Sequence, residues 1–199
     1  SPTSTPAPSP TAFPPPTPTF GPTQTPTAPV TPTPTTISTT PPTPVPGTNL
    51  VQNGGFESSG SWVYSATYAP KRSQTEAHSG SYSLEVGNKS GQQGDSTAYQ
   101  LVSIPSSAHK ASLSFYYWPA SNDSSTYAWQ EADIVDSNGN VLQQLFQSTT
   151  NDQVWIQMTF DLSAYAGQTI GIQLLDHEES NGGAYFTYMY VDDVALNVS

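Results

Sequence analysis

The chain contains no cysteine and only 4 basic residues among its 199. Without cysteine it can form no disulfide bond, no Cys-based zinc site and no thiol nucleophile. No run of apolar residues approaches the roughly 18 that a membrane-spanning helix needs, so we expect no membrane span. The 15 acidic residues give a net charge of −11, which disfavours nucleic acid and anionic membranes as partners.

Residues 1–47 contain no charged residue at all, but they hold 17 of the 20 prolines and 15 threonines. Proline fixes φ near the polyproline II value and biases the residue before it in the same way, so this segment predicts an extended arm. At about 3.1 Å per residue, a stiff arm of this length would reach on the order of 140 Å. We therefore divide the chain into a Pro/Thr-rich stalk, residues 1–47, and a folded domain, residues 48–199.

The composition of the stalk is typical of O-glycosylated segments, and a plain flexible linker is the alternative. A glycosylated stalk predicts an extracellular or cell-surface location. The expected acceptors are the threonines of the arm: Thr3, Thr5, Thr11, Thr17, Thr19, Thr23, Thr25, Thr27, Thr31, Thr33, Thr35, Thr36, Thr39, Thr40 and Thr43.

The domain shows the period-two alternation of β-strands and no convincing helical stripe. Apolar residues occupy every second position from Val154 to Leu162, which predicts a half-buried strand. The pair Asn138-Gly139 between apolar runs predicts a hairpin. Strands are expected at 50–56, 61–68, 82–86, 98–104, 113–117, 132–134, 141–142, 154–162, 170–174 and 185–198. Nine or ten short strands predict an all-β antiparallel sandwich, most simply a jelly roll.

Several motifs together resemble one family. They are Asn49 to Glu57 (NLVQNGGFE) with a following Trp62, His78 to Leu84 (HSGSYSL), Phe160 to Thr169 (FDLSAYAGQT) and Tyr190 to Leu196 (YVDDVAL). In this order they resemble the galactose-binding-like jelly-roll modules related to carbohydrate-binding modules, over residues 49–198. Such modules often follow Pro/Thr stalks in secreted bacterial proteins. Because the superfamily is functionally broad, the resemblance implies a fold more strongly than a function.

The resemblance also implies a structural calcium ion near the junction of the first and last strands. The matching side chains are Glu57 and one or both of Asp192 and Asp193, whose carboxylate oxygens suit that ion. Ordinary acidity at a sheet edge is the alternative. The turn Asp136 to Asn140 lacks the glycine of a calcium-binding loop and has Gln147 in place of its bidentate glutamate, so it predicts only a hairpin.

Sugar binding in this superfamily uses aromatic rings that stack on pyranose faces, with amides and carboxylates for the hydroxyl groups. The candidates for binding a glycan are Tyr116, Trp118, Tyr127, Trp129, Gln130 and Glu131, with Trp155, Tyr188 and Tyr190 as further possibilities. Tyrosine on a strand also reflects ordinary β-propensity. Contact with protein, or packing against the glycans of the chain's own stalk, would use the same residues.

Catalysis finds little support in the sequence. His78, His109 and His177 are isolated, and no His-Glu-x-x-His, Gly-x-Ser-x-Gly or phosphate-loop motif is present. Fifteen acids always offer some pair for glycoside hydrolysis, but nothing else in the sequence supports it. We therefore expect a protein that is not an enzyme and that needs no cofactor beyond the structural calcium.

Large apolar residues in the stalk predict that it makes contacts: Phe13, Phe20, Val30, Ile37 and Val45. Residues 35–40 lack proline and are rich in β-branched residues, so they could add a strand to a neighbouring sandwich, and head-to-tail addition gives a filament. The leading interpretation is a non-enzymatic structural subunit of an extracellular fibre or surface stalk that binds copies of itself. The alternative is a carbohydrate-binding module tethered to a secreted hydrolase. An adhesive domain that recognises protein is a third possibility.

Overall fold

The computed structural model describes residues 47–64, 68–179 and 185–199. The chain divides into two units, Ser1–Ile37 and Ser38–Ser199, and every described residue belongs to the second. The glycosylation sites and assembly contacts expected on the arm lie outside the described residues. They stay predictions.

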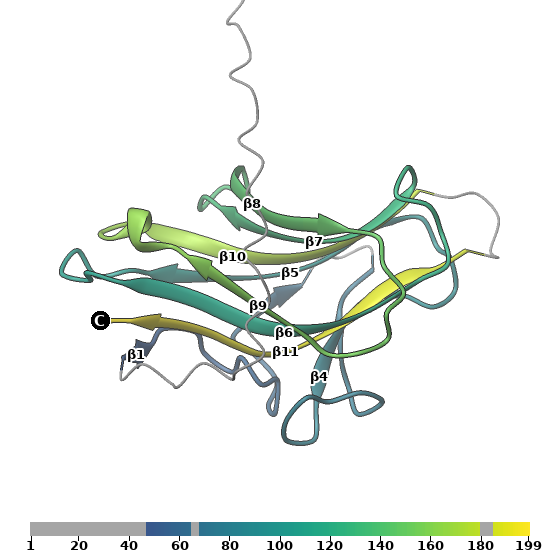
Figure 1. The fold of residues 1–199 in the computed structure, drawn as a ribbon, viewed down its shortest axis with the longest axis horizontal. Coiled ribbons are helices and arrows are strands. Elements are labelled where there is room, and N and C mark those ends of the chain that lie inside the picture. The colour runs from purple at the N-terminus through teal and green to yellow at the C-terminus, as the bar shows by residue number, and fades with distance from the viewer. Residues whose placement is uncertain (1–46, 65–67, 180–184) are drawn as a thin grey trace, which may run out of the picture. The chain divides into compact units, whose positions relative to one another are not determined.

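The described residues form two antiparallel sheets packed face to face, which confirms the predicted β-sandwich (Figure 1). Sheet A has the strand order β3 (Lys71–Ser73), β4 (Ser83–Asn88), β11 (Thr187–Val198), β6 (Ala111–Ser121) and β9 (Ile156–Asp161), and β1 (Thr48–Asn49) also pairs with β11. Sheet B has the order β2 (Val63–Tyr64), β5 (Gly94–Ser103), β10 (Thr169–Glu178), β7 (Ala128–Val135) and β8 (Val141–Ser148). The one helical turn in the described part is a 3-10 turn, Ser163–Tyr165.

The core lies between the sheets and follows directly from the alternation of the strands. In β6 the side chains of Leu113, Phe115 and Tyr117 face inward, and in β10 those of Ile170 and Ile172 do so. Each fully buried side chain of this size contributes about 1.5–3 kcal/mol relative to exposure. The same alternation points the intervening side chains of every strand away from the core, so the sandwich has two outer faces.

Residues 50–56 are not the strand that the sequence predicts. Asn53 and Phe56 have φ values of 51° and 54°, in the left-handed region that breaks an extended strand. The turn they form places the Phe56 side chain in the core, where its ring centroid lies 5.4 Å from that of Trp62. Local turn geometry therefore overrides the apolar pattern here. The short strand β3 has no alternation that could reveal it in the sequence.

The predicted hairpin between β7 and β8 is confirmed. The Asp136 carboxylate accepts hydrogen bonds from the backbone N–H groups of Asn138 and Asn140, at 2.8 and 2.9 Å. Gly139 has a φ of 86°, which explains why the turn needs glycine.

The described residues contain no helix long and apolar enough to cross a bilayer.

Candidate functional site

The outer side of sheet B carries a group of acidic, amide and aromatic side chains, and we call it the sheet B face. It consists of the outward side chains of β5, β10, β7 and β8. The strand register arranges them in rows across the sheet. The rows are Leu101, Gly171, Val135 and Val141; Tyr99, Gln173, Asp133 and Gln144; Thr97, Leu175, Glu131 and Gln147; and Asp95, His177 and Trp129.

Two carboxyl groups lie side by side at the middle of this face. Glu131 and Asp133 are two residues apart on β7, and Asp133 is only 1% exposed. Gln144 and Gln147 donate from Nε2 to the two oxygens of Glu131, each at 3.0 Å. Gln173 donates from Nε2 to Asp133 Oδ2 at 3.2 Å. Neutral amides from both neighbouring strands therefore hold the pair.

The two carboxyl groups are close enough to share a proton. Burial, followed by the negative charge of Glu131, raises the pKa of Asp133 to about 7. Near neutral pH the pair consequently carries less than its full negative charge. A protonated carboxyl group donates a hydrogen bond and an ionised one accepts, so the pair can offer both functions to a ligand.

An aromatic and imidazole stack lies at one end of the face. The rings of Trp129 and His177 stack with centroids 3.9 Å apart and an interplanar angle of 19°. His177 Nδ1 lies 2.6 Å from a carboxylate oxygen of Asp95, which fixes the orientation of the imidazole. One face of the Trp129 ring therefore packs on an imidazole that is itself held in place by Asp95.

Three buried polar atoms on the sheet B face have no hydrogen-bond partner within the described part of the chain. They are Trp129 Nε1, Asp133 Oδ1 and His177 Nε2. Buried polar atoms in folded proteins are nearly always paired, so each of these three atoms calls for a partner such as an ordered water molecule or a ligand group. No strand of sheet A carries an atom of this kind among the residues that the structure describes.

The apolar end of the sheet B face is formed around a glycine. A Cβ atom at Gly171 would lie 2.6 Å from Val135 Cγ2 and 3.4 Å from Leu101 Cδ2, so these two side chains close over the glycine. Leu101 is 45% exposed and Val141 55%. The face thus passes from an apolar end, across the carboxyl pair, to the Trp129 stack.

The outer side of sheet A, the sheet A face, also carries aromatic residues, but these contact other side chains of the domain. Tyr190 and Glu85 are almost fully buried although they point away from the core. Lys89 donates from Nζ to the Tyr190 hydroxyl at 2.5 Å, and both Lys89 and Lys71 pair with the Glu85 carboxylate. The His78 ring stacks on Tyr116 with centroids 3.6 Å apart.

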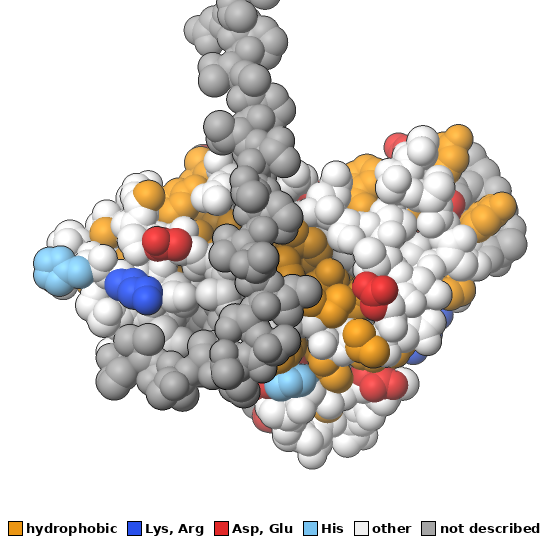
Figure 2. Space-filling model, in the orientation of Figure 1, with side chains coloured by type: hydrophobic (Ala, Val, Ile, Leu, Met, Phe, Trp, Pro, Cys, Tyr) orange, Lys and Arg blue, Asp and Glu red, His pale blue; other side chains and the backbone are white. Residues whose placement is uncertain are grey.

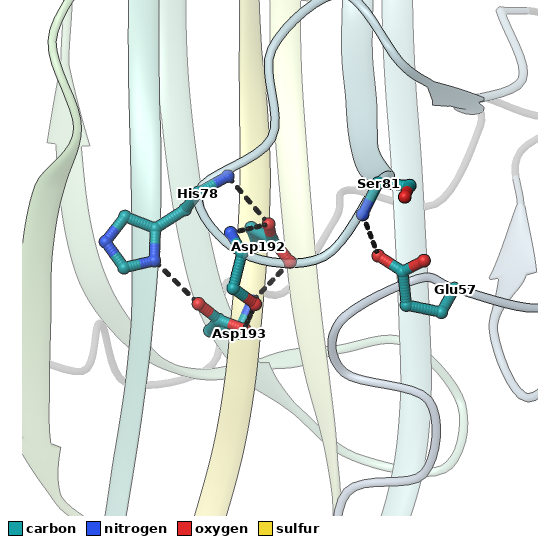
Figure 3. A network of polar contacts seen from close by, with 6 residues as sticks. Glu57, His78, Ser81, Asp192 and Asp193 are labelled. Carbon is teal, nitrogen blue, oxygen red and sulfur yellow. Dashed lines mark hydrogen bonds and ion pairs between the residues drawn. The ribbon is translucent and has the colours of Figure 1, made fainter.

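The residues proposed for calcium form a hydrogen-bonded clasp (Figure 3). Asp192 Oδ2 accepts hydrogen bonds from the backbone N–H groups of His78 and Ser79, at 2.9 and 3.0 Å. Glu57 Oε1 accepts from the backbone N–H groups of Ser81 and Tyr82, at 2.8 and 2.9 Å. The segment between β3 and β4 is thereby tied to β11 and to the loop that contains Glu57.

A β-bulge builds this clasp. The register of β11 against β6 shifts between Asp192 and Ala195, and Asp193 has a φ of 53°. Because of the irregularity two consecutive carboxylates reach the same segment, Asp193 binding the imidazole of His78 and the hydroxyl of Ser79, each at 2.6 Å. Burial raises the pKa of Asp192, and the hydrogen bonds that its carboxylate accepts from backbone N–H groups act in the opposite direction.

The carboxylates that the sequence proposes for calcium already accept hydrogen bonds from backbone N–H groups, at Glu57 Oε1 and at both oxygens of Asp192. No group of three or more acidic or histidine side chains suited to a metal ion occurs in residues 47–64, 68–179 and 185–199. Calcium at Glu57, Asp192 and Asp193 stays a prediction.

The structure separates the six residues that the sequence proposes for sugar binding. Trp129 and Glu131 lie on the sheet B face, and Tyr116 and Trp118 lie on the sheet A face. The remaining two lie on neither. Tyr127 is half exposed just before β7. Gln130 is fully buried, donating from Nε2 to the hydroxyl of Thr187 at 3.0 Å, so its position does not fit contact with a sugar.

Sequence reasoning missed Tyr99, Asp133, Gln144, Gln147 and Gln173. The period of two along a strand could have joined Asp133 to Trp129 and Glu131, and it could have excluded Gln130. The glutamines and Tyr99 come from three other strands. Only the pairing register places them beside the carboxyl pair.

The domain has the β-sandwich fold of carbohydrate-binding modules. TmCBM61 in complex with β-1,4-galactotriose matches with a TM-score of 0.57 and 18% identity, over 76% of this chain and 99% of that one. The CBM22-1 xylan-binding domain of Xyn10C from Paenibacillus barcinonensis matches with a TM-score of 0.51 and 16% identity, over 76% and 95%. The K1 adhesin domain of Lys-gingipain from Porphyromonas gingivalis W83 matches with 0.52 and 16%, over 77% and 99%.

By sequence, the chain matches no protein-family model and no curated protein. At these identities the structural likenesses show the fold alone. An assignment of function has to come from the site that this chain builds on the fold.

Proposed function

We propose that residues 48–199 form a non-catalytic carbohydrate-binding module and that the sheet B face is its sugar-binding surface. The observation that carries the proposal is the meeting of three kinds of side chain on one outer face. These are the carboxyl pair of Glu131 and Asp133, the glutamine amides around it, and the stacked ring of Trp129. Carboxylates and amides suit sugar hydroxyl groups, and an aromatic face suits the apolar side of a pyranose.

The size of the face favours an oligosaccharide over a single sugar. Four strands, β5, β10, β7 and β8, contribute to it, and three strand spacings of about 4.8 Å span roughly 14 Å. The rows from Leu101 to Trp129 extend it further along the strands. A chain of several sugars can therefore contact the carboxyl pair and the Trp129 ring at once.

The geometry of the carboxyl pair argues against hydrolysis of that sugar. Glycosidases that use two carboxyl groups hold them about 5 Å or more apart, on opposite sides of the bond to be cleaved. Glu131 and Asp133 are two residues apart on β7 and point to the same side of one sheet. They are suited to holding a ligand. They are not placed to flank a scissile bond.

The solved structures that share the fold support a binding role. Two of them are described as a complex with β-1,4-galactotriose and as a xylan-binding domain. With the Pro/Thr-rich stalk, this favours an extracellular module tethered to a secreted hydrolase. The fibre-subunit interpretation rests on the arm, residues 1–47, of which nearly all lies outside the described residues, and it stays a prediction.

The test compares two tryptophans on opposite faces. Titration calorimetry with xylo-, galacto-, cello- and amino-sugar oligomers first identifies a ligand. We then expect Trp129→Ala to weaken binding at least tenfold, equivalent to about 1.4 kcal/mol. Trp118→Ala, the matched change on the sheet A face, should alter the affinity less than about twofold. Loss of binding in Trp118→Ala alone, or no binding of any oligomer, would refute the proposal.

A further inference from the structure

The sheet B face contains acidic groups and no basic ones. Its charged side chains are Asp95, Glu131 and Asp133, with His177 beside them. The four basic residues of the whole chain lie in or next to strands of sheet A: Lys71 and Arg72 in β3, Lys89 after β4, and Lys110 before β6. On the side of the molecule drawn in Figure 2, which is not the sheet B face, red Asp and Glu side chains also outnumber the blue Lys and Arg ones. An anionic sugar would meet repulsion on the sheet B face.

The carboxyl pair differs from the other buried carboxylates on the outer faces. Glu85 is paired with two lysines, at 2.9 and 3.6 Å. Asp192 accepts hydrogen bonds from the backbone N–H groups of His78 and Ser79. Glu131 and Asp133 receive hydrogen bonds from neutral amides, and each has the other carboxyl group as its charged neighbour.

Two adjacent buried carboxyl groups repel each other when both are ionised, and no cation beside them offsets that repulsion. Each disfavours ionisation of the other, and both would be stabilised by one positive charge within hydrogen-bond distance. The protein supplies no such charge here. Hydrogen bonds between an ammonium group and a carboxylate are about twice as strong as neutral ones, and a partly water-excluded position strengthens them further.

We propose that the ligand of the sheet B face is an amino sugar polymer with free amines, and that one of its ammonium groups sits on the carboxyl pair of Glu131 and Asp133. This rests on the proposed function and specifies its ligand class. The ammonium has three N–H donors, which suit the carboxylate oxygens of the pair. Trp129, in the adjoining row, stacks on the next sugar ring.

Binding of the cation is coupled to release of a proton. The shared proton of the pair passes to solvent, the ammonium keeps its own protons, and the pair then carries two negative charges against one positive charge. The other titratable groups around the pair are His177 on β10 and Asp95 and Tyr99 on β5; β8 contributes only Gln144 and Gln147. None of these supplies a permanent positive charge.

The experiment compares two ligands that differ only in the amine. The β-1,4-linked glucosamine tetramer and its fully N-acetylated counterpart are titrated into the full chain at pH 6.5, with a neutral xylotetraose as a third ligand. We expect the free amine to bind at least tenfold more tightly than the acetylated form, and the affinity to fall as salt is raised. Titration in two buffers of different ionisation enthalpy should show net proton release.

Variants identify the position of the amine. Glu131→Gln and, independently, Asp133→Asn should bring the two tetramers to within about twofold of each other. Asp152→Asn removes an exposed carboxylate from the loop before β9 and should leave the preference unchanged. Using both pair variants keeps the test valid if one of them fails to fold.

Other outcomes overturn the inference in distinguishable ways. If a neutral or acetylated oligomer binds as tightly as the amine, and Trp129→Ala still abolishes that binding, the amine is refuted and the proposed function stands. If sugar binding requires added Ca²⁺ and is lost with a chelator, the positive charge is a metal ion and the amine is again refuted. If no oligomer binds, both proposals fail.

Discussion

The two outer faces of the sandwich carry similar residues in different circumstances. On the sheet A face, aromatic rings pack against one another, and the buried carboxylates have lysine or backbone N–H partners within the domain. Tyr190 is bonded to Lys89, and Tyr116 lies under His78. On the sheet B face, Trp129 and Asp133 keep buried polar atoms without partners in the described residues.

The difference teaches that residue type alone does not mark a binding surface. Trp118 and Trp129 are equally good candidates in the sequence, and both are outward residues of central strands. What separates them is whether the domain's own loops have used the surrounding hydrogen-bond donors and acceptors. A covered face contributes stability, and a face with unused polar groups is available for a ligand.

The largest expected effect comes from the clasp on the sheet A side. Asp192→Ala removes the acceptor for the backbone N–H groups of His78 and Ser79 and leaves them unpaired beside a buried site. We expect a loss of about 3 kcal/mol in the free energy of unfolding, measured by urea denaturation. Sugar affinity at 25 °C should not change.

Asp193→Ala is the control, because the Asp193 side chain is 31% exposed and binds only side chains of the same segment. Its cost should be smaller, about 1 kcal/mol. A large loss of affinity in Asp192→Ala would show that the clasp and the sheet B face are coupled. The assignment of stability to the sheet A face and of binding to the sheet B face would then be wrong.

A smaller effect concerns the pH dependence of stability. The fold raises the pKa of Asp133 from its ordinary value of 3.8 to about 7, so the folded state binds the proton more tightly than the unfolded state. Stability should therefore fall as pH rises from about 4 to 7 and level off above that. Chemical denaturation at pH 5 and pH 8 measures the difference.

Asp133→Asn should reduce this slope without abolishing it, because burial also raises the pKa of Asp176 and of Asp192. At pH 8 the variant should be at least as stable as the native chain, since it no longer carries a buried charge beside Glu131. An unchanged slope in Asp133→Asn would contradict a shared proton at the pair.

The smallest effect is expected at Lys71 on the sheet A side. Its Nζ lies 2.9 Å from Glu85 Oε1, but the lysine side chain is 68% exposed and Lys89 remains as a second partner. Lys71→Ala should cost about 0.5 kcal/mol or less, and the loss should shrink further in 1 M salt. A cost above 2 kcal/mol would mean that the Glu85 carboxylate depends on both lysines.

Much of the fold could be predicted from the sequence, because alternation is local. The apolar residues at every second position predicted the strands β6, β9, β10 and β11, and Asn138-Gly139 predicted the β7–β8 hairpin. The failures were also local in origin. Residues 50–56 have an apolar pattern, but left-handed backbone at Asn53 and Phe56 makes them a turn.

The candidate site was predicted only in part. Glu131 and Trp129 were identified from residue type, while Gln130 between them was included because residue type takes no account of the direction of alternating side chains. Gln144, Gln147 and Gln173 have no signal of their own, since glutamine on a strand is chemically ordinary until a carboxylate lies opposite. Their role depends on which strands pair and in which register.

By itself the sequence determined most of the strands, the alternation of sides along them, and the acidic character of the domain, because all three follow from residue identity and a fixed period of two. The tertiary structure alone decided which outward residues meet. Strand order brought β8 and β10 to either side of β7. Contacts between residues distant in the chain depend on packing of the whole domain, which no local pattern encodes.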